Sequence, residues 1–202
     1  MSARPFDAKK ELEDYRARHG QFRVLDIPTR NFLMIDGQGD PNTSAAYGAA
    51  LQALYPLAYA VKFRSRRELG RDYVVPPLEG RWWAEDMEVF TSARDKTRWH
   101  WRLMLMTPSW ITGEMVETSG EVRWEAFEEG RCVQTLHVGP YDAEGPVLEQ
   151  MHLEVIPARR LEITGLHHEI YLGDPRRAAP ERLRTILRQP VTNREALEQP
   201  PH

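Results

Sequence analysis

The sequence predicts an α+β fold in which helices cover one face of an antiparallel sheet and the other face, or the seam between two halves, is open for binding. Three observations lead to this fold class. Strand-like segments come in neighbouring pairs, long helical stretches separate these pairs, and the order strand–strand–helix recurs in the second half without clear sequence identity. The 202 residues suffice for one domain with a substantial core, or for two small fused units.

The first half begins with a short charged helix, expected over residues 7–19, with Asp7 as its N-cap and Gly20 as its C-terminal stop. Two strands follow, over 22–26 and 30–36, where β-branched and aromatic residues gather between turn residues. These strands would lead directly into the longest helix of the chain.

A glycine-containing stretch, "DGQGDPN", connects the second strand to that helix. It has G-x-G spacing but no third glycine and no Lys-Ser/Thr pair, so it is interpreted as a loop and not as a phosphate-binding motif. Thr43 or Ser44 can cap the helix, and Pro56 is expected to break or kink it. Two further strands would then form a hairpin across residues 86–96, followed by a short helix.

The second half repeats this order. Residues 122–141 predict a strand, a turn and a strand, 142–160 a helix with Pro146 near its start, and 161–172 a returning strand. The expected organisation is an N-terminal helical arm over 1–20, a single domain over 21–192 made of two pseudo-repeats at about 21–110 and 121–192, and a polar tail over 193–202.

Composition argues against several classes of protein. The net charge is −3 and the pI about 6.2, so a nucleic-acid-binding surface is not indicated. Cys132 is the only cysteine, which excludes an intrachain disulfide and a cysteine-based zinc cluster. No segment has the apolar length of a membrane span or a secretory leader, so a cytoplasmic location without membrane contact is expected.

Glu169 is the most informative residue, because it places a carboxylate inside a short segment with strand character. Side chains alternate along a strand, so Glu169 should share a face with His167 and Tyr171, while Ile170 and Leu172 face the helices. In an apolar cleft the acid would serve to meet a cationic ligand or to act as a general acid or base. The alternative is a structural ion pair between Glu169 and Arg176, Arg177 or another basic group.

Tryptophan is abundant, with six residues, five of which fall in predicted strands. Large aromatics can simply build a core, but they also line many small-molecule sites. The sequence does not decide which strand face borders a cleft. The candidate ligand-binding residues are Trp83, Trp101, Trp124, Tyr55, His137 and Glu85.

Other catalytic patterns are missing. The adjacent His167 and His168 would point to opposite faces of a strand, and no H-E-x-x-H or similar ligand spacing occurs, so no metal or other cofactor is predicted. There is no G-x-S-x-G motif, and nothing around Cys132 marks it as a nucleophile. Covalent acyl transfer is therefore disfavoured.

Four segments together resemble the GyrI-like small-molecule-binding proteins in their stand-alone form. They are "FLMIDGQGDPN", "EGRWWAEDM", "HVGPYDAEGPVLEQMH" and "HHEIYLGDPRRAAPERLRTILRQPV". The resemblance extends over roughly residues 8–192. It implies a duplicated β-α-β-β fold of the SHS2 type, with a ligand groove along the pseudo-twofold axis between the repeats.

The resemblance also implies a function. Relatives that sense drugs receive lipophilic cations on a buried glutamate, and some stand-alone members resemble hydrolases that open the cyclopropane ring of DNA-alkylating compounds. Glu169 matches the central acid and Tyr171 lies in the same motif. We expect Glu169 to deprotonate a water that attacks the ring, and Tyr171, with His137, to donate hydrogen bonds to the carbonyl that gains charge. Glu85 is a second candidate carboxylate.

A non-enzymatic role remains open beside this one. A drug-sequestering protein, or the effector-sensing part of a regulator, would bind flat hydrophobic or cationic aromatic molecules without turnover. An inhibitor of gyrase is implied by the family name alone, since no segment indicates the necessary surface. A homodimer also remains open.

Overall fold

The computed structural model describes residues 4–85, 95–118 and 120–194, and the chain divides into two compact units. Unit 1 contains Met1–Glu13 and Thr29–Phe127, and unit 2 contains Asp14–Pro28 and Glu128–His202. Each unit combines antiparallel strands with one main helical stretch, so the predicted α+β class with a repeated β-α-β-β arrangement is confirmed. Within the described residues, no helix combines the length and apolar character needed to cross a membrane.

Unit 1 has four antiparallel strands in the order β3–β4–β2–β5. Its elements are α1 (Ala8–Glu11), β2 (Arg30–Gln38), α2 (Ala45–Leu69), β3 (Leu78–Trp83), the 3-10 turn η3 (Lys96–Arg98), β4 (His100–Thr107), the 3-10 turn η4 (Gly113–Met115) and β5 (Arg123–Phe127). The predicted pairing of β3 with β4 is confirmed, although residues 86–94 of their connection lie outside the described part. The predicted helix over 7–19 is reduced to α1 and the 3-10 turn η1 (Glu13–Tyr15).

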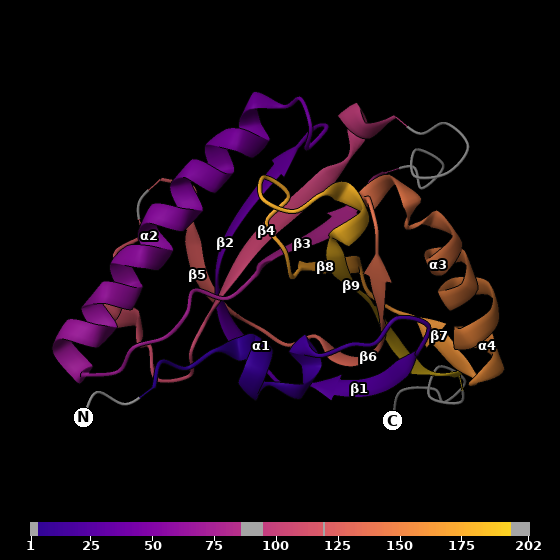
Figure 1. Cartoon of the computed structure of the whole chain (residues 1–202), viewed down its shortest axis with the longest axis horizontal. Helices are drawn as coiled ribbons and strands as arrows, with labels where there is room; N and C mark the ends of the chain where they lie inside the picture. The colour runs from indigo at the N-terminus through magenta and orange to yellow at the C-terminus, as the bar shows by residue number, and fades with distance from the viewer. Residues whose placement is uncertain (1–3, 86–94, 119, 195–202) are drawn as a thin grey trace, which may run out of the picture. The chain divides into compact units, whose positions relative to one another are not determined.

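The helix α2 lies along the strands of its own unit (Figure 1). Its buried residues recur every three or four positions, as one face of a helix requires: Ala50, Leu54, Ala58, Val61 and Ser65. Gly70 ends it in the left-handed conformation, with φ 64°. The predicted break at Pro56 is wrong, because α2 continues through this residue; the buried stripe on both sides of the proline holds the helix together.

Trp101 of β4 explains a glycine in β2. The two strands pair in a register that places Trp101 opposite Gly37, and a Cβ added to Gly37 would come within 2.1 Å of the indole ring. The first glycine of "DGQG" is therefore a strand residue that makes room for a tryptophan, and not part of the predicted loop. Its neighbour Gly39, with φ 112°, is the glycine that turns the chain.

Unit 2 has the strand order β1–β6–β9–β8, and β7 also pairs with β9. Its elements are β1 (Arg23–Ile27), β6 (Gly130–Val138), the 3-10 turn η5 (Tyr141–Ala143), α3 (Gly145–Glu149), the π-helical η6 (Gln150–Val155), α4 (Ile156–Ala158), β7 (Leu161–Ile163), β8 (His167–Tyr171), the 3-10 turn η7 (Pro180–Arg182) and β9 (Arg184–Asn193). The sequence reading did not predict β9, which pairs with three strands of this unit.

Each half of the sequence begins with two strands that were predicted as a pair, but in the structure the two strands join different units. β1 pairs with β6 in unit 2, whereas β2, which follows it after a short turn, pairs with β4 and β5 in unit 1. β5 and β6 separate in the same way. The simple division into repeats at 21–110 and 121–192 therefore differs from the compact units, because each unit takes one strand from the other half of the sequence.

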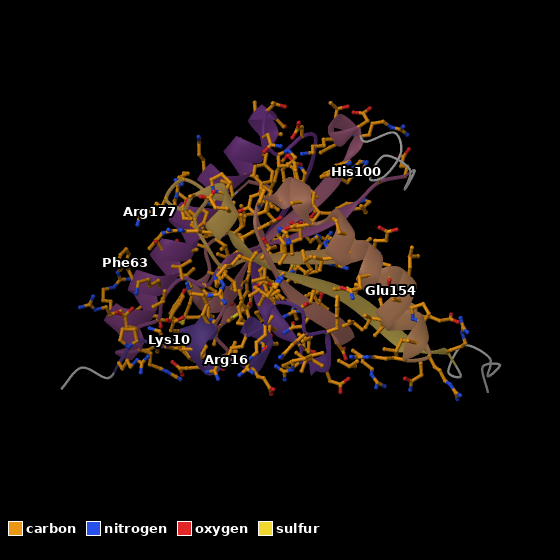
Figure 2. The ribbon with its side chains drawn as sticks, turned by 45° about the vertical axis from the view of Figure 1, so that its right-hand side comes forward. Lys10, Arg16, Phe63, His100, Glu154 and Arg177 are labelled. Atoms are coloured by element: carbon orange, nitrogen blue, oxygen red, sulfur yellow. The ribbon has the colours of Figure 1, made fainter. Side chains whose placement is uncertain are left out.

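The helical stretch α3–η6–α4 packs its inner side on the strands of unit 2. Met151 and Ile156 join Val133, Leu187 and Val191 in one buried cluster. Its outer side carries exposed residues such as Glu154 (Figure 2). In unit 1, Phe63 is likewise an exposed residue of α2. The inner side of this helix identifies the face of the strands on which the candidate site lies.

Candidate functional site

A cluster of polar side chains lies in unit 2 on one face of β6, β9 and β8. His137, Thr185 and Tyr171 are opposite one another in the registers β6–β9 and β9–β8, so their side chains lie in a row on one face. Glu169 is opposite Leu187, one step along that face. The start of α3 adds Glu144, whose pKa responds to both Glu169 and Thr185.

The orientation of this face differs from the prediction. Leu187, the partner of Glu169, belongs to the buried cluster that contains Met151 and Ile156 of the helical stretch. Glu169 therefore shares the face that the helix of its own unit covers, and Ile170 is buried on the opposite face. Alternation placed Glu169 with His167 and Tyr171 correctly, but it could not show which set met the helices.

Glu169 is held by neighbours on its own strand. The Tyr171 hydroxyl donates a hydrogen bond of 2.7 Å to Glu169 Oε2, and His167 Nε2 lies 3.4 Å from Oε1. The Glu169 side chain is 14% exposed. Of the alternative partners, Arg176 and Arg177 are wrong, since both guanidinium groups pair with Asp174; the basic group beside Glu169 is His167. Glu169 is thus not committed to a structural ion pair with either arginine.

Glu144 is a second carboxyl group in the cluster, and the sequence reading did not propose it. It is the N-cap residue of α3 and is 5% exposed, yet its side chain makes no capping hydrogen bond, and its Oε1 has no hydrogen-bond partner among the described residues. Burial raises the pKa of Glu144 to about 10, and the negative charges of Glu169 and Asp142 raise it further. The nearby Thr185 hydroxyl lowers this pKa, although it makes no hydrogen bond of ordinary geometry within the described chain.

Glu144 is therefore a neutral carboxylic acid at pH 7. A helix N-terminus ordinarily favours a negative charge, by about 0.3–1 kcal/mol, but here loss of solvent and a neighbouring carboxylate outweigh that effect. An acid directly before Gly-Pro at the start of a helix is the sequence signal that could have indicated it. The sequence alone could not show that this acid turns inward toward β8.

Tyr141 completes the cluster from the η5 turn. Its ring meets that of Tyr171 edge to face, with 5.4 Å between ring centroids. Burial raises the pKa of Tyr141 to about 12, with further contributions from Glu144, Glu169 and Asp174. Both tyrosines therefore add apolar ring surface next to the two carboxyl groups. The Tyr141 hydroxyl gives up its proton less readily than an ordinary tyrosine does.

The predicted residue His137 also lies in unit 2. It is 4% exposed, and its Nε2 is 3.1 Å from the carbonyl oxygen of Pro140, which directs the ring toward the turn that carries Tyr141. Its Nδ1 has no hydrogen-bond partner among the described residues. His137 thus supports the wall of the cluster next to Thr185.

His168 points to the other face of β8, as strand alternation predicts. There it contacts Glu129 at 2.6 Å, and Arg188 of β9 contacts the same carboxylate at 2.7 Å. All three side chains are 3% exposed or less. Burial alone would raise the pKa of Glu129, but His168 and Arg188 together lower it to about 2. This buried ion cluster is a structural feature, separated from Glu169 by the strands.

The remaining predicted residues lie in unit 1. Trp101 is 1% exposed and packs against Tyr47 at 5.3 Å, which makes it a core residue and not an exposed wall. Trp124 donates a hydrogen bond of 3.0 Å to Thr107 and joins a cluster beneath α2. The other three are partly or fully exposed: Trp83, stacked on His100, Tyr55 in α2, and Glu85.

Neither of two hollows bordered by described side chains has Glu169 in its lining. One of about 120 Å³ in unit 1 is lined by Glu85, Arg98 and His100 with Gln38. One of about 240 Å³ in unit 2 lies beside Phe22, Thr135 and Val147. The candidate site is instead the carboxyl cluster, where burial keeps Glu144 neutral close to the Glu169 carboxylate. Such a pair is the usual arrangement for dividing acid and base roles.

Comparison with known proteins agrees with this architecture. The model of the GyrI-like small molecule binding domain matches residues 20–191. The chain belongs to the GyrI-like family. Its fold and its most specific segments are therefore those of small-molecule binding domains, as the resemblance implied.

Three solved structures from Listeria innocua are similar to this GyrI-like chain. An uncharacterized conserved protein is 39% identical, with a TM-score of 0.82 and coverage of 93% of this chain and 100% of the other. Two structures of hydrolases are each 37% identical, with TM-scores of 0.78 and 0.80 and coverage of 93% and 94% of this chain and 100% of theirs. No curated protein matched the sequence.

Proposed function

We propose that this GyrI-like protein binds flat hydrophobic or cationic small molecules and hydrolyses cyclopropane-containing DNA-alkylating compounds, a detoxification reaction. The observation that carries the proposal is the Glu169 carboxylate, held at 2.7 Å by the Tyr171 hydroxyl within a largely buried cluster. Similarity to two structures of hydrolases supports a hydrolytic reaction.

The base in this reaction is Glu169. Tyr171 fixes Oε2, so Oε1, which lies 3.4 Å from His167 Nε2, is the oxygen that accepts a proton from a bound water. The water attacks the ring methylene of the bound compound, and the electron pair of the breaking C–C bond moves into the conjugated carbonyl. The role of Tyr171 in this proposal is therefore to orient the base. It differs from the expectation that the Tyr171 hydroxyl donates a hydrogen bond to the carbonyl of the bound compound.

The direct experiment follows ring opening by mass spectrometry. Purified protein is mixed with a cyclopropane-conjugated dienone, and the expected product has gained the mass of one water. Glu169→Gln keeps the size of the side chain but cannot accept the proton, so we expect at least a 100-fold loss of rate. Full activity in this variant, or no ring opening by the wild type above the rate in buffer, refutes the proposal.

Binding without turnover is the second candidate function. The Glu169 carboxylate beside the neutral Glu144 in a largely buried cluster favours it, since a lipophilic cation would balance the negative charge of Glu169. Titration with a cationic dye, followed by fluorescence, is the test. Tight dye binding together with unchanged cyclopropane compound assigns the protein to drug sequestration instead of hydrolysis.

A further inference from the structure

We infer that the Glu144 carboxyl group is the proton donor of the ring-opening reaction and protonates the carbonyl oxygen of the bound compound while Glu169 takes a proton from the attacking water. This inference rests on the proposed hydrolytic function. It assigns a catalytic role to a residue that was not among the candidate site residues predicted from the sequence.

The reaction needs a donor that the predicted residues do not provide. As the ring opens, negative charge builds on the carbonyl oxygen, and a donor aimed at that oxygen stabilises it. The Tyr171 hydroxyl is already donated to Glu169, and His137 Nε2 is directed at the carbonyl oxygen of Pro140, 3.1 Å away. Tyr141, with its pKa raised to about 12, is a poor source of a proton at neutral pH. The cluster therefore requires another acid.

The geometry of Glu144 fits this role. Its carboxyl is 5% exposed, and Oε1 makes no hydrogen bond with any residue that the structure describes. A buried carboxyl oxygen without a hydrogen-bond partner is energetically unfavourable, so its presence calls for an explanation. A bound ligand that presents a carbonyl oxygen would pair with this group and remove the cost.

The surroundings of Glu144 keep it protonated. The groups that face it are Glu169 from β8, Asp142 and Tyr141 from η5, and Thr185 from β9. The carboxylates in this set are negative, and the described set contains no cation that would draw the proton away. A neutral carboxyl group at Glu144 close to the Glu169 carboxylate provides an acid and a base for one reaction.

The proton balance closes without a further reactant. A C–O bond forms between water and the ring methylene, the ring C–C bond breaks, and the carbonyl becomes a phenol with the proton from Glu144. The water proton resides on Glu169 and then passes to Glu144, directly or through water. This transfer restores the starting state, so one water is consumed in each turnover.

The experiment compares turnover and binding of the cyclopropane-conjugated dienone in four variants. Glu144→Gln removes the transferable proton, Glu144→Asp retains a carboxyl group, Glu169→Gln removes the base, and Glu149→Gln changes an exposed acid on the same helix as a control. Rates come from mass spectrometry between pH 6 and pH 10, and Kd comes from quenching of tryptophan fluorescence.

We expect Glu144→Gln to lower kcat about 100-fold while Kd changes less than threefold. The wild-type rate should fall as the pH approaches 10, and this fall should be missing in Glu144→Gln. Glu144→Asp should recover at least tenfold over the glutamine variant, and Glu149→Gln should match the wild type.

Three outcomes overturn the inference. A Glu144→Gln rate within threefold of the wild type removes the donor role but leaves the proposed hydrolysis intact. A loss of rate matched by an equal loss of binding, or equal loss in the aspartate and glutamine variants, assigns Glu144 to structure. No turnover by the wild type overturns the proposed hydrolysis itself and the donor role with it.

Discussion

The replacement of Glu144 by glutamine should stabilise the folded protein, and the gain should grow with pH. In the unfolded chain the carboxyl has its ordinary pKa of 4.5, whereas burial and the charge of Glu169 raise the folded value to about 10. Between these values the unfolded chain has lost this proton and the folded chain retains it. The free energy of unfolding from this group therefore falls by about 1.4 kcal/mol for each pH unit of increase.

Between pH 4.5 and pH 7 the wild type therefore loses about 3 kcal/mol of unfolding free energy, and a neutral amide at this position would not cause this loss. The contribution of the wild-type carboxyl is complete below pH 4.5 and is lost as the pH rises toward 10. Glutamine has nearly the same size and no proton to lose. Glu144→Gln should thus match the wild type below pH 4.5 and exceed it by about 3 kcal/mol at pH 7, and by more at pH 8.

Urea denaturation monitored by tryptophan fluorescence measures this difference at pH 5, 7 and 8. The exposed Glu149→Gln on the same helix is the matched control, and it should show no such trend. A difference between Glu144→Gln and the wild type that stays constant from pH 5 to pH 8 would refute the reasoning. So would a variant less stable than the wild type at pH 8.

Three further substitutions test other parts of the structure. Tyr171→Phe removes the hydroxyl that orients the catalytic base, so kcat for ring opening should fall about tenfold with little change in Kd; unaltered kcat would show that the 2.7 Å hydrogen bond has no role in the reaction. Gly37→Ala forces a Cβ against the ring of Trp101 and should destabilise the protein by about 1–3 kcal/mol in urea denaturation, and a neutral effect would contradict the close packing. Arg188→Ala leaves the Glu129 carboxylate buried without its guanidinium and should cost about 3–5 kcal/mol at pH 7. Because the folded pKa of Glu129 is about 2, the ionised Glu129 stabilises the wild type fully above pH 4.5, and this stabilisation is lost as the pH falls toward 2. If the wild type and Arg188→Ala lost stability equally on acidification, the role of this ion pair would be refuted.

Much of the secondary structure follows from local patterns. The strands β2, β4, β6 and β8 were predicted because alternating and β-branched residues mark half-buried strands, and α2 because its small and apolar residues recur at helical spacing. The helical stretch from Gly145 was predicted with its early proline. The strand β9 was not predicted, because "LRTILRQPV" follows a polar, proline-containing segment and contains arginines that only tertiary pairing can accommodate.

The predicted site residues illustrate the same limit. Glu169 and Tyr171 were identified because side chains two residues apart on a strand share one face. In the structure the Tyr171 hydroxyl donates a hydrogen bond to Glu169. Trp101 was expected to line a cleft, and it is instead packed in the core of unit 1. A tryptophan in a strand has the same local pattern in either position, so the sequence could not distinguish them.

By itself, the sequence determined that the chain forms an α+β fold with a carboxylate and a phenol on one strand face, since both follow from the periods of backbone geometry. Only the tertiary structure decided that β1 and β5 each join strands from the other half of the chain, that the helix of unit 2 covers the Glu169 face, and that Glu144 turns inward beside it. The physical reason is that the protonation of an acid depends on the loss of solvent and on nearby charges, and both arise from contacts between segments distant in sequence.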